Sequence, residues 1–118
     1  KAKASEMARL CIRLAWLFRI KKDEKEKDFL NYALKYYRET YERENFPVEK
    51  LDEFTCMYMI AELYRRTEQF DESVKWFSRI VGSAEARKNP TLIESARDQF
   101  QLAKEQMEKS GKSVSETA

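Results

Sequence analysis

Residues 51–81 carry the apolar pattern that most constrains the fold of this chain. Their periodicity predicts two amphipathic helices joined by a tight connection at residues 67–70. Small residues at Ala61 and Ser73 predict that the two helices cross closely, while the larger Tyr64 and Phe77 fill the space between successive hairpins. Such a hairpin cannot cover its own apolar face, so we expect neighbouring hairpins to stack on it. The ordered positions are Met57, Ile60, Ala61 and Tyr64 in the first helix and Ser73 and Phe77 in the second.

A second, weaker copy of this pattern lies earlier in the chain. In its second helix, Ala33 and Tyr37 have the same spacing as Ser73 and Phe77. In its first helix the matching positions are Cys11, Leu14, Ala15 and Phe18, which have the spacing of Met57, Ile60, Ala61 and Tyr64. Two matching copies favour an internal repeat over a helical bundle with coincidental spacing.

The spacing resembles that of the tetratricopeptide repeat, W-x2-L-G-x2-Y…A-x3-F, with conservative replacements. Only 2 Gly and 2 Pro occur in the 118 residues, so little turn chemistry is available for a β-rich fold. We therefore expect an all-α domain, a tetratricopeptide-like stack of two helical hairpins plus a C-terminal capping helix. The charged run at 21–28 and the linkers after each hairpin would lengthen the repeat beyond its usual ~34 residues.

Local signals predict where the helices begin and end. We expect a single domain over residues 1–109, with hairpins at about 5–43 and 52–81 and the capping helix at about 90–109. Ser5, Asp52 and Asp71 are suitable N-caps, because their side chains can accept hydrogen bonds from the first backbone amides. Asn89 followed by Pro90 predicts the start of the capping helix. Residues 83–89 fit either a helical turn or a loop, and the composition of 110–118 predicts a disordered tail.

The residues present argue against catalysis. The chain has no histidine, which removes the commonest general base and metal ligand. Gly82 and Gly111 stand alone, so the sequence has no glycine-rich phosphate loop. Cys11 and Cys56 lie in apolar helical runs without a histidine partner, and we expect buried, unpaired thiols in a reducing compartment. We therefore expect no enzyme activity, no metal and no cofactor.

The sequence also predicts where the protein is located. No signal peptide is visible and no uncharged stretch is long enough to cross a bilayer, so we expect a cytoplasmic protein without a membrane partner. The chain begins at Lys1 rather than at a methionine. We therefore expect a fragment whose N-terminal region is missing.

Charge is unevenly distributed along the chain. The sequence has 23 Lys and Arg against 21 Asp and Glu, a formal net charge of +2. Residues 1–22 hold seven of the basic residues but only one acidic residue, Glu6. The overall balance is not that of a general polyanion binder. Nucleic-acid binding through the basic first helix is therefore a weaker alternative.

The first predicted helix is apolar on more than one side. Ile12, Trp16 and Ile20 form a second row beside the core stripe, and a helix that is apolar on two sides needs two neighbours. The core stripe comprises Met7, Leu10, Cys11, Leu14, Ala15, Leu17 and Phe18.

The predicted binding surface lies on the first helix of each hairpin, because these helices line the concave face of such a stack. Aromatic, apolar and arginine side chains mix there, and these types are enriched at binding hot spots. The candidate partner-binding residues are Arg9, Ile12, Arg13, Trp16 and Arg19 on the first helix and Tyr58, Met59, Glu62, Arg65 and Arg66 on the third.

Longer strings in the sequence indicate a more specific relationship. The segments NFPVEKLDEFTCMYMIAELYRR, WFSRIVGS and KNP are similar to an uncharacterised bacterial family, over most of residues 4–107. In that family a cysteine-rich, zinc-ribbon-like N-terminal segment precedes a tetratricopeptide-like region. The resemblance implies the helical fold and a bacterial cytoplasmic setting. It implies no activity, and no metal ligand can be carried onto these residues.

From these features we expect a non-catalytic protein-interaction scaffold that binds a peptide or helix through its concave face. The partner would be another protein or the missing N-terminal region of the chain itself. The alternative is structural, with the extra apolar row on the first helix forming the seam of a homodimer. A strict monomer at high concentration would exclude that alternative.

Overall fold

The computed structural model describes the backbone of residues 3–43, 46 and 51–117, and the side chains of these ranges up to residue 110. Its α-helices are α1 (Ala4–Ile20), α2 (Lys25–Arg43), α3 (Glu53–Arg66), α4 (Phe70–Val81) and α5 (Pro90–Thr117), with a short 3₁₀ helix, η1 (Ala86–Lys88), before α5. No β-strand occurs in these described ranges, so the predicted all-α class is confirmed.

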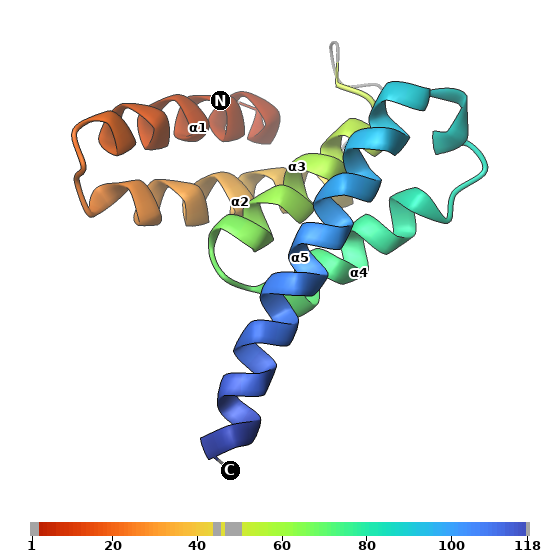
Figure 1. Cartoon of the computed structure of the whole chain (residues 1–118). Coiled ribbons are helices and arrows are strands. Elements are labelled where there is room, and N and C mark those ends of the chain that lie inside the picture. The colour runs from red at the N-terminus through yellow and green to blue at the C-terminus, as the bar shows by residue number, and fades with distance from the viewer. Residues whose placement is uncertain (1–2, 44–45, 47–50, 118) are drawn as a thin grey trace.

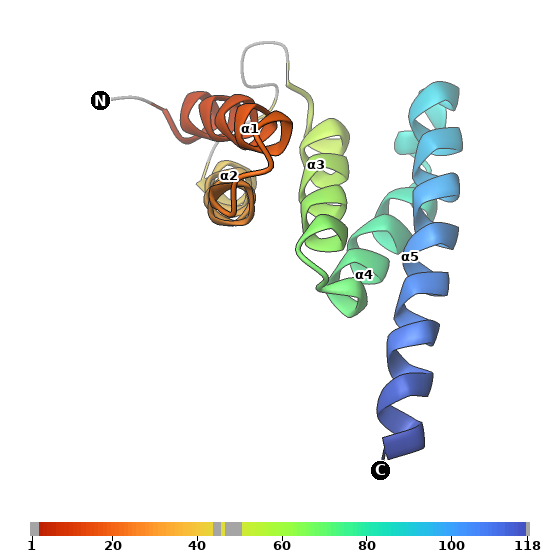
Figure 2. The same cartoon turned by 60° about the vertical axis from the view of Figure 1, so that its left-hand side comes forward.

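The helices form two hairpins and a fifth helix that follows them (Figure 1). α1 packs on α2, α3 packs on α4, and α5 packs mainly on α4. The two hairpins meet through α2 and α3, so that α3 lies in the middle of the molecule and α1 at one end (Figure 2). α2, rather than α3, is therefore the main neighbour of α1.

Two of the predicted helix starts are confirmed by their capping hydrogen bonds. The Asp52 carboxylate accepts a hydrogen bond from the Thr55 backbone amide at 2.8 Å, at the start of α3. The Asn89 side-chain oxygen accepts one from the Leu92 amide at 3.2 Å, and Pro90 is the first residue of α5. Both caps satisfy amides that the first helical turn leaves without intrahelical partners.

Two predicted N-caps and one predicted helix end are wrong. Ser5 lies inside α1 and is buried against the neighbouring helix, so it does not serve as the N-cap. Asp71 lies in the first turn of α4, which begins at Phe70; there its charge interacts favourably with the helix dipole. α5 continues to Thr117 instead of ending near residue 109. Gly111 and the nearby serines are weak helix formers, but no proline interrupts the helix once it has formed.

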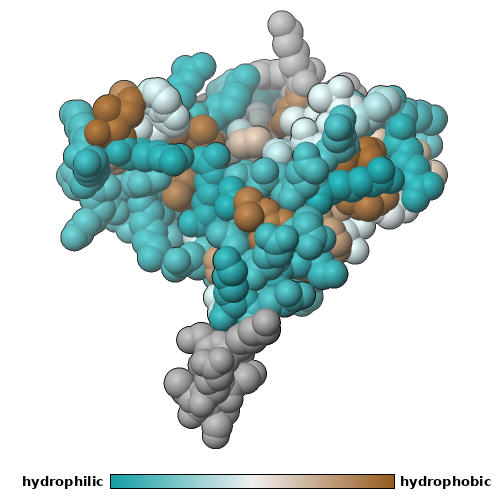
Figure 3. Space-filling model, in the orientation of Figure 1, coloured by the Kyte–Doolittle hydropathy of each residue, from teal (hydrophilic) through white to brown (hydrophobic). Residues whose placement is uncertain are grey.

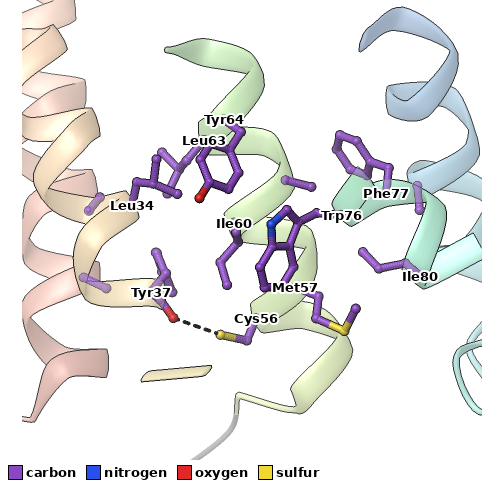
Figure 4. Packing of buried hydrophobic residues seen from close by; sticks show 14 of the residues in the cluster. Leu34, Tyr37, Cys56, Met57, Ile60, Leu63, Tyr64, Trp76, Phe77 and Ile80 are labelled. Carbon is purple, nitrogen blue, oxygen red and sulfur yellow. Dashed lines mark hydrogen bonds between the residues drawn. The ribbon is translucent and has the colours of Figure 1, made fainter. Parts of the chain in front are cut away.

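The core is built around α3, which has neighbours on two sides (Figure 4). Ile60 and Phe77 are completely buried and Tyr64 nearly so, as predicted. The Ser73 hydroxyl on α4 donates a hydrogen bond to the Ala61 carbonyl oxygen on α3 at 2.8 Å. Such a contact requires the two backbones to approach closely, and the small side chains at both positions permit it.

Arginine–aromatic contacts tie the second hairpin to α2. The Arg79 guanidinium on α4 lies 4.5 Å from the centre of the Trp76 ring, and its Nη2 donates a hydrogen bond to the Tyr41 hydroxyl at 2.8 Å. Arg38 on α2 lies 5.2 Å from the same Trp76 ring. It also donates a hydrogen bond to the Tyr64 hydroxyl on α3. These contacts join α2 to both helices of the second hairpin, beside the direct packing of α2 on α3.

α1 buries only part of its predicted core stripe, namely Cys11 and Ala15. Its buried side chains are all small: Ser5, Ala8, Cys11 and Ala15. Leu10 and Leu17, which were predicted to lie on the core stripe, are 48% and 52% exposed. Leu14 and Phe18 are half-buried, and the Phe18 ring stacks on Phe29 of α2 at 5.3 Å between centroids. The small residues decide the outcome, because they let α1 and α2 approach closely on that side.

Candidate interaction surface

The outward side of α1 carries a group of exposed apolar residues that we call the α1 face. It consists of Leu10, Trp16, Leu17 and Ile20, whose exposed fractions lie between 48% and 59%. Arg13 is also exposed and lines the same apolar hollow as Trp16 and Leu17. In Figure 3, apolar side chains are visible near the outer end of α1, bordered by hydrophilic surface. Exposed apolar clusters of this kind mark interaction sites more often than solitary exposed residues do.

A second hollow, the Arg19–Arg66 groove, adjoins this face where α1 comes nearest to the end of α3. α1 contributes Ile12, Trp16 and Arg19, α2 contributes Glu26 and Leu30, and α3 contributes Arg66. Arg65 lines the neighbouring part of the same region. The fold therefore brings together six of the ten predicted partner-binding residues, from helices that are far apart in sequence: Ile12, Arg13, Trp16, Arg19, Arg65 and Arg66.

Ion pairs on α3 decide which charges remain available in the groove. Glu62 accepts hydrogen bonds from Arg65 at 2.6 Å and from Arg66 at 3.0 Å, and its side chain is only 12% exposed. Arg65 also contacts Gln106 of α5, with 3.4 Å between Nη1 and Oε1. Glu62 is thus committed to two cations. Arg19, Arg65 and Arg66 outnumber Glu62 and Glu26, the two carboxylates in the described part of this region, so a small excess of positive charge remains at this end of the groove.

Tyr58 and Met59 take part in packing instead of lining the groove. The Tyr58 ring lies edge-on to Phe77 with 5.5 Å between centroids, and Met59 is half-buried against the core. Burial raises the pKa of the Tyr58 phenol, and the Glu62 carboxylate raises it further. α3 has no wide free face because α2 and α4 cover two of its sides. Arg9 is exposed on α1, outside the residues that line the groove.

Sequence reasoning missed four residues of this surface: Leu10 and Leu17 of α1 and Glu26 and Leu30 of α2. The two leucines could have been assigned from the run of Ser5, Ala8 and Ala15, since small residues three or seven positions apart mark a close helix contact. No local pattern indicates the roles of Glu26 and Leu30. Their position across from Arg66 depends on how the hairpins pack.

The chemical groups that could support other functions are few. Burial raises the pKa of the Cys56 thiol to about 12, with smaller contributions from Asp52 and Glu53, and burial also raises the pKa of Cys11. Neither thiol is activated as a nucleophile. Among residues whose side chains are described, no cluster of three or more His, Cys, Asp or Glu could hold a metal ion. No helix within the described part of the chain is long and apolar enough to span a membrane.

The fold and this surface define an all-α protein of two packed hairpins and a fifth helix, with an exposed apolar face at one end. Over residues 1–103 the chain matches the model of a family described as an uncharacterised protein conserved in bacteria (DUF2225), and it belongs to that family. The predicted relationship to an uncharacterised bacterial family is confirmed at this level. No curated protein and no solved structure matches the chain.

Proposed function

We propose that this chain is a non-catalytic, tetratricopeptide-like module that binds a segment of another protein along the α1 face and the Arg19–Arg66 groove. The observation that carries the proposal is the exposure of Leu10, Trp16, Leu17 and Ile20 on one side of a single helix. Burying apolar surface is favourable by roughly 25 cal/mol of free energy for every Å² removed from water, and these exposed side chains do not gain it. A partner that covers them recovers this free energy.

The composition of the surface supports a protein partner. A large aromatic side chain, Trp16, sits among aliphatic residues, and Arg13 and Arg19 lie beside it. Trp and Arg are the residue types that most often dominate the energy of protein interfaces. The repeat-like spacing of the two hairpins also supports the module, since the first helices of stacked hairpins supply the binding face in tetratricopeptide proteins.

The module differs from a regular tetratricopeptide stack in which of its helices pack between its hairpins. α2 rather than α1 packs on α3, so the two first helices come together mainly near Arg19 and Arg66. The proposed binding surface is therefore chiefly the length of α1, with the groove at one end. We place this interaction in the cytoplasm, because the free, buried Cys11 and Cys56 are typical of a reducing compartment.

Site-specific photocrosslinking in bacterial cells tests the proposal. A photoreactive phenylalanine analogue would replace Trp16 in one strain and the exposed Tyr32 of α2 in a matched control strain. We expect the Trp16 position alone to form an adduct with one identifiable protein, and Leu17→Ala to reduce its yield. Equal adducts from both positions, or none from either, would contradict the proposal. An adduct at twice the mass of the chain would instead support the homodimer seam.

A further inference from the structure

We infer that the segment bound on α1 is an amphipathic helix that carries acidic residues within its apolar stripe. This inference rests on the proposed function and specifies the chemistry of its partner. Three features carry it: the charge of α1, the position of Arg13 and the spacing of the exposed residues.

The charge around the α1 face is positive. Residues 3–22 contain six Lys or Arg and only Glu6 on the acidic side, and among the described residues Glu26 of α2 is the one carboxylate that lines the adjoining groove. In the described side chains, no ion-pair partner within 4 Å offsets Arg13 or Arg19. A partner with carboxylates opposite these guanidinium groups would gain charge-assisted hydrogen bonds and would associate faster.

Arg13 lies inside the apolar face rather than at its edge. It follows Leu10 by three positions and precedes Leu17 and Ile20 by four and seven, so all four project from one side of α1. Covering the three apolar neighbours necessarily covers the stem of Arg13 as well. A partner that lacks a carboxylate at this point would desolvate the guanidinium without compensation, which is costly.

The spacing of these residues fits a second helix. From Leu10 to Ile20 the row extends for about 15 Å along α1, at a rise of ~1.5 Å per residue. Apolar residues on another helix recur at the same three- and four-residue intervals, so their ridges can pack into the grooves of this one. An acidic residue one turn away from the partner's apolar anchors would then lie opposite Arg13. A second acidic residue, near the end of the partner helix, would lie opposite Arg19 and Arg66.

Other occupants fit less well. In an isologous dimer, two copies of the α1 face would each bring Arg13 and Arg19 toward the other's positive charge. On a lipid surface, inserting Leu17 and Ile20 would carry the central Arg13 toward hydrocarbon, which opposes insertion. Along a nucleic acid, the four apolar residues would remain without contacts that favour them.

A displayed peptide library provides the test. Each peptide would be a helix of about five turns with leucines fixed at alternating three- and four-residue intervals, and the flanking positions would vary among Glu, Gln and Lys. Selection on the full chain should enrich Glu beside the central leucines. The selected peptides should bind about tenfold more weakly to Arg13→Glu and Arg13→Gln, and with unchanged affinity to the matched control Arg97→Glu on α5. Replacing the peptide's central Glu by Lys should restore binding to Arg13→Glu.

The possible outcomes distinguish failure of this inference from failure of the proposed binding function. Peptides that require Trp16 but show no preference for Glu would overturn the inference and leave the binding surface standing. Selection of no Trp16-dependent peptide would overturn both. Trp16-dependent dimerisation, or Trp16-dependent sedimentation with vesicles of phosphatidylglycerol and phosphatidylcholine, would likewise overturn the acidic-helix partner in favour of a second copy or a membrane surface.

Discussion

Ser73 and Ala61 join α4 to α3 where the two helices pack: the buried Ser73 hydroxyl donates a hydrogen bond to the Ala61 carbonyl oxygen at 2.8 Å. A longer side chain at either position would separate the two helices. The pair therefore helps to hold the two helices of the second hairpin together.

We predict that Ser73→Leu destabilises the domain more than Ser73→Ala does. Removing the hydroxyl should cost about 1 kcal/mol, the net value of a typical hydrogen bond. Inserting leucine should cost about 1–3 kcal/mol because it overpacks a site with no free volume. Urea denaturation would measure both changes, with the same substitutions at the exposed Ser78 as controls. Equal stability of the two Ser73 variants would show that the crossing tolerates a wider separation.

Phe77→Ala should be among the most destabilising single substitutions in the chain. Phe77 is completely buried and its ring contacts Tyr58 edge-on. Truncating a buried aromatic side chain typically costs about 3–5 kcal/mol, including the cavity that remains. Tyr32→Ala, at a half-exposed aromatic position on α2, is the control. A loss below about 1 kcal/mol for Phe77→Ala would place this residue outside the core.

Trp16→Ala should separate binding from folding. Because Trp16 is 59% exposed, its removal should change the free energy of unfolding far less than Phe77→Ala does. It should weaken partner binding by more than about 2 kcal/mol, or self-association by the same amount if α1 instead forms the seam of a homodimer. Chemical denaturation and titration with a selected peptide measure the two effects. If Trp16→Ala unfolds the chain but leaves binding per folded molecule intact, Trp16 belongs to the core.

The two thiols should react slowly in the native protein. Cys56 is completely buried and Cys11 nearly so, and both are free. A thiol reagent should therefore label them at the rate at which the domain opens, and at once in denaturant. Intact-mass measurements over time would follow the labelling. Rapid native labelling, or the mass of an intramolecular disulfide, would contradict the structure.

Stability should decline at alkaline pH because of Cys56. The unfolded thiol ionises near pH 9, whereas burial keeps the folded thiol protonated up to about pH 12. The folded state then binds more protons than the unfolded state within this window, so the free energy of unfolding falls as the pH rises. The stability that the protonated Cys56 thiol contributes is fully present below pH 9 and is lost toward pH 12. Cys56→Ala should show a shallower decline in urea denaturation, and an unchanged slope would rule out this cause.

The sequence by itself determined the elements and much of the core. The periodicity of residues 51–81 predicted α3 and α4, and the local chemistry of Asp52 and Asn89 predicted where α3 and α5 begin. Ile60 and Phe77 were predicted to be buried because they repeat at helical spacing on one face. These signals are local, since a cap or a helical stripe is encoded within a few turns of the chain.

The tertiary structure alone decided which faces are free. Periodicity shows that α1 has two apolar sides, and its small residues favour one of them for close packing, but the packing on α2 decides that Ala8 and Ala15 are covered while Leu10 and Leu17 face outward. Likewise, the sequence places Tyr58 beside the core stripe of α3, and the contact with Phe77 assigns it to packing. The physical reason is that burial depends on the distance and angle between helices. Those are set by side chains on both partners, including small residues whose contribution is the close approach they permit.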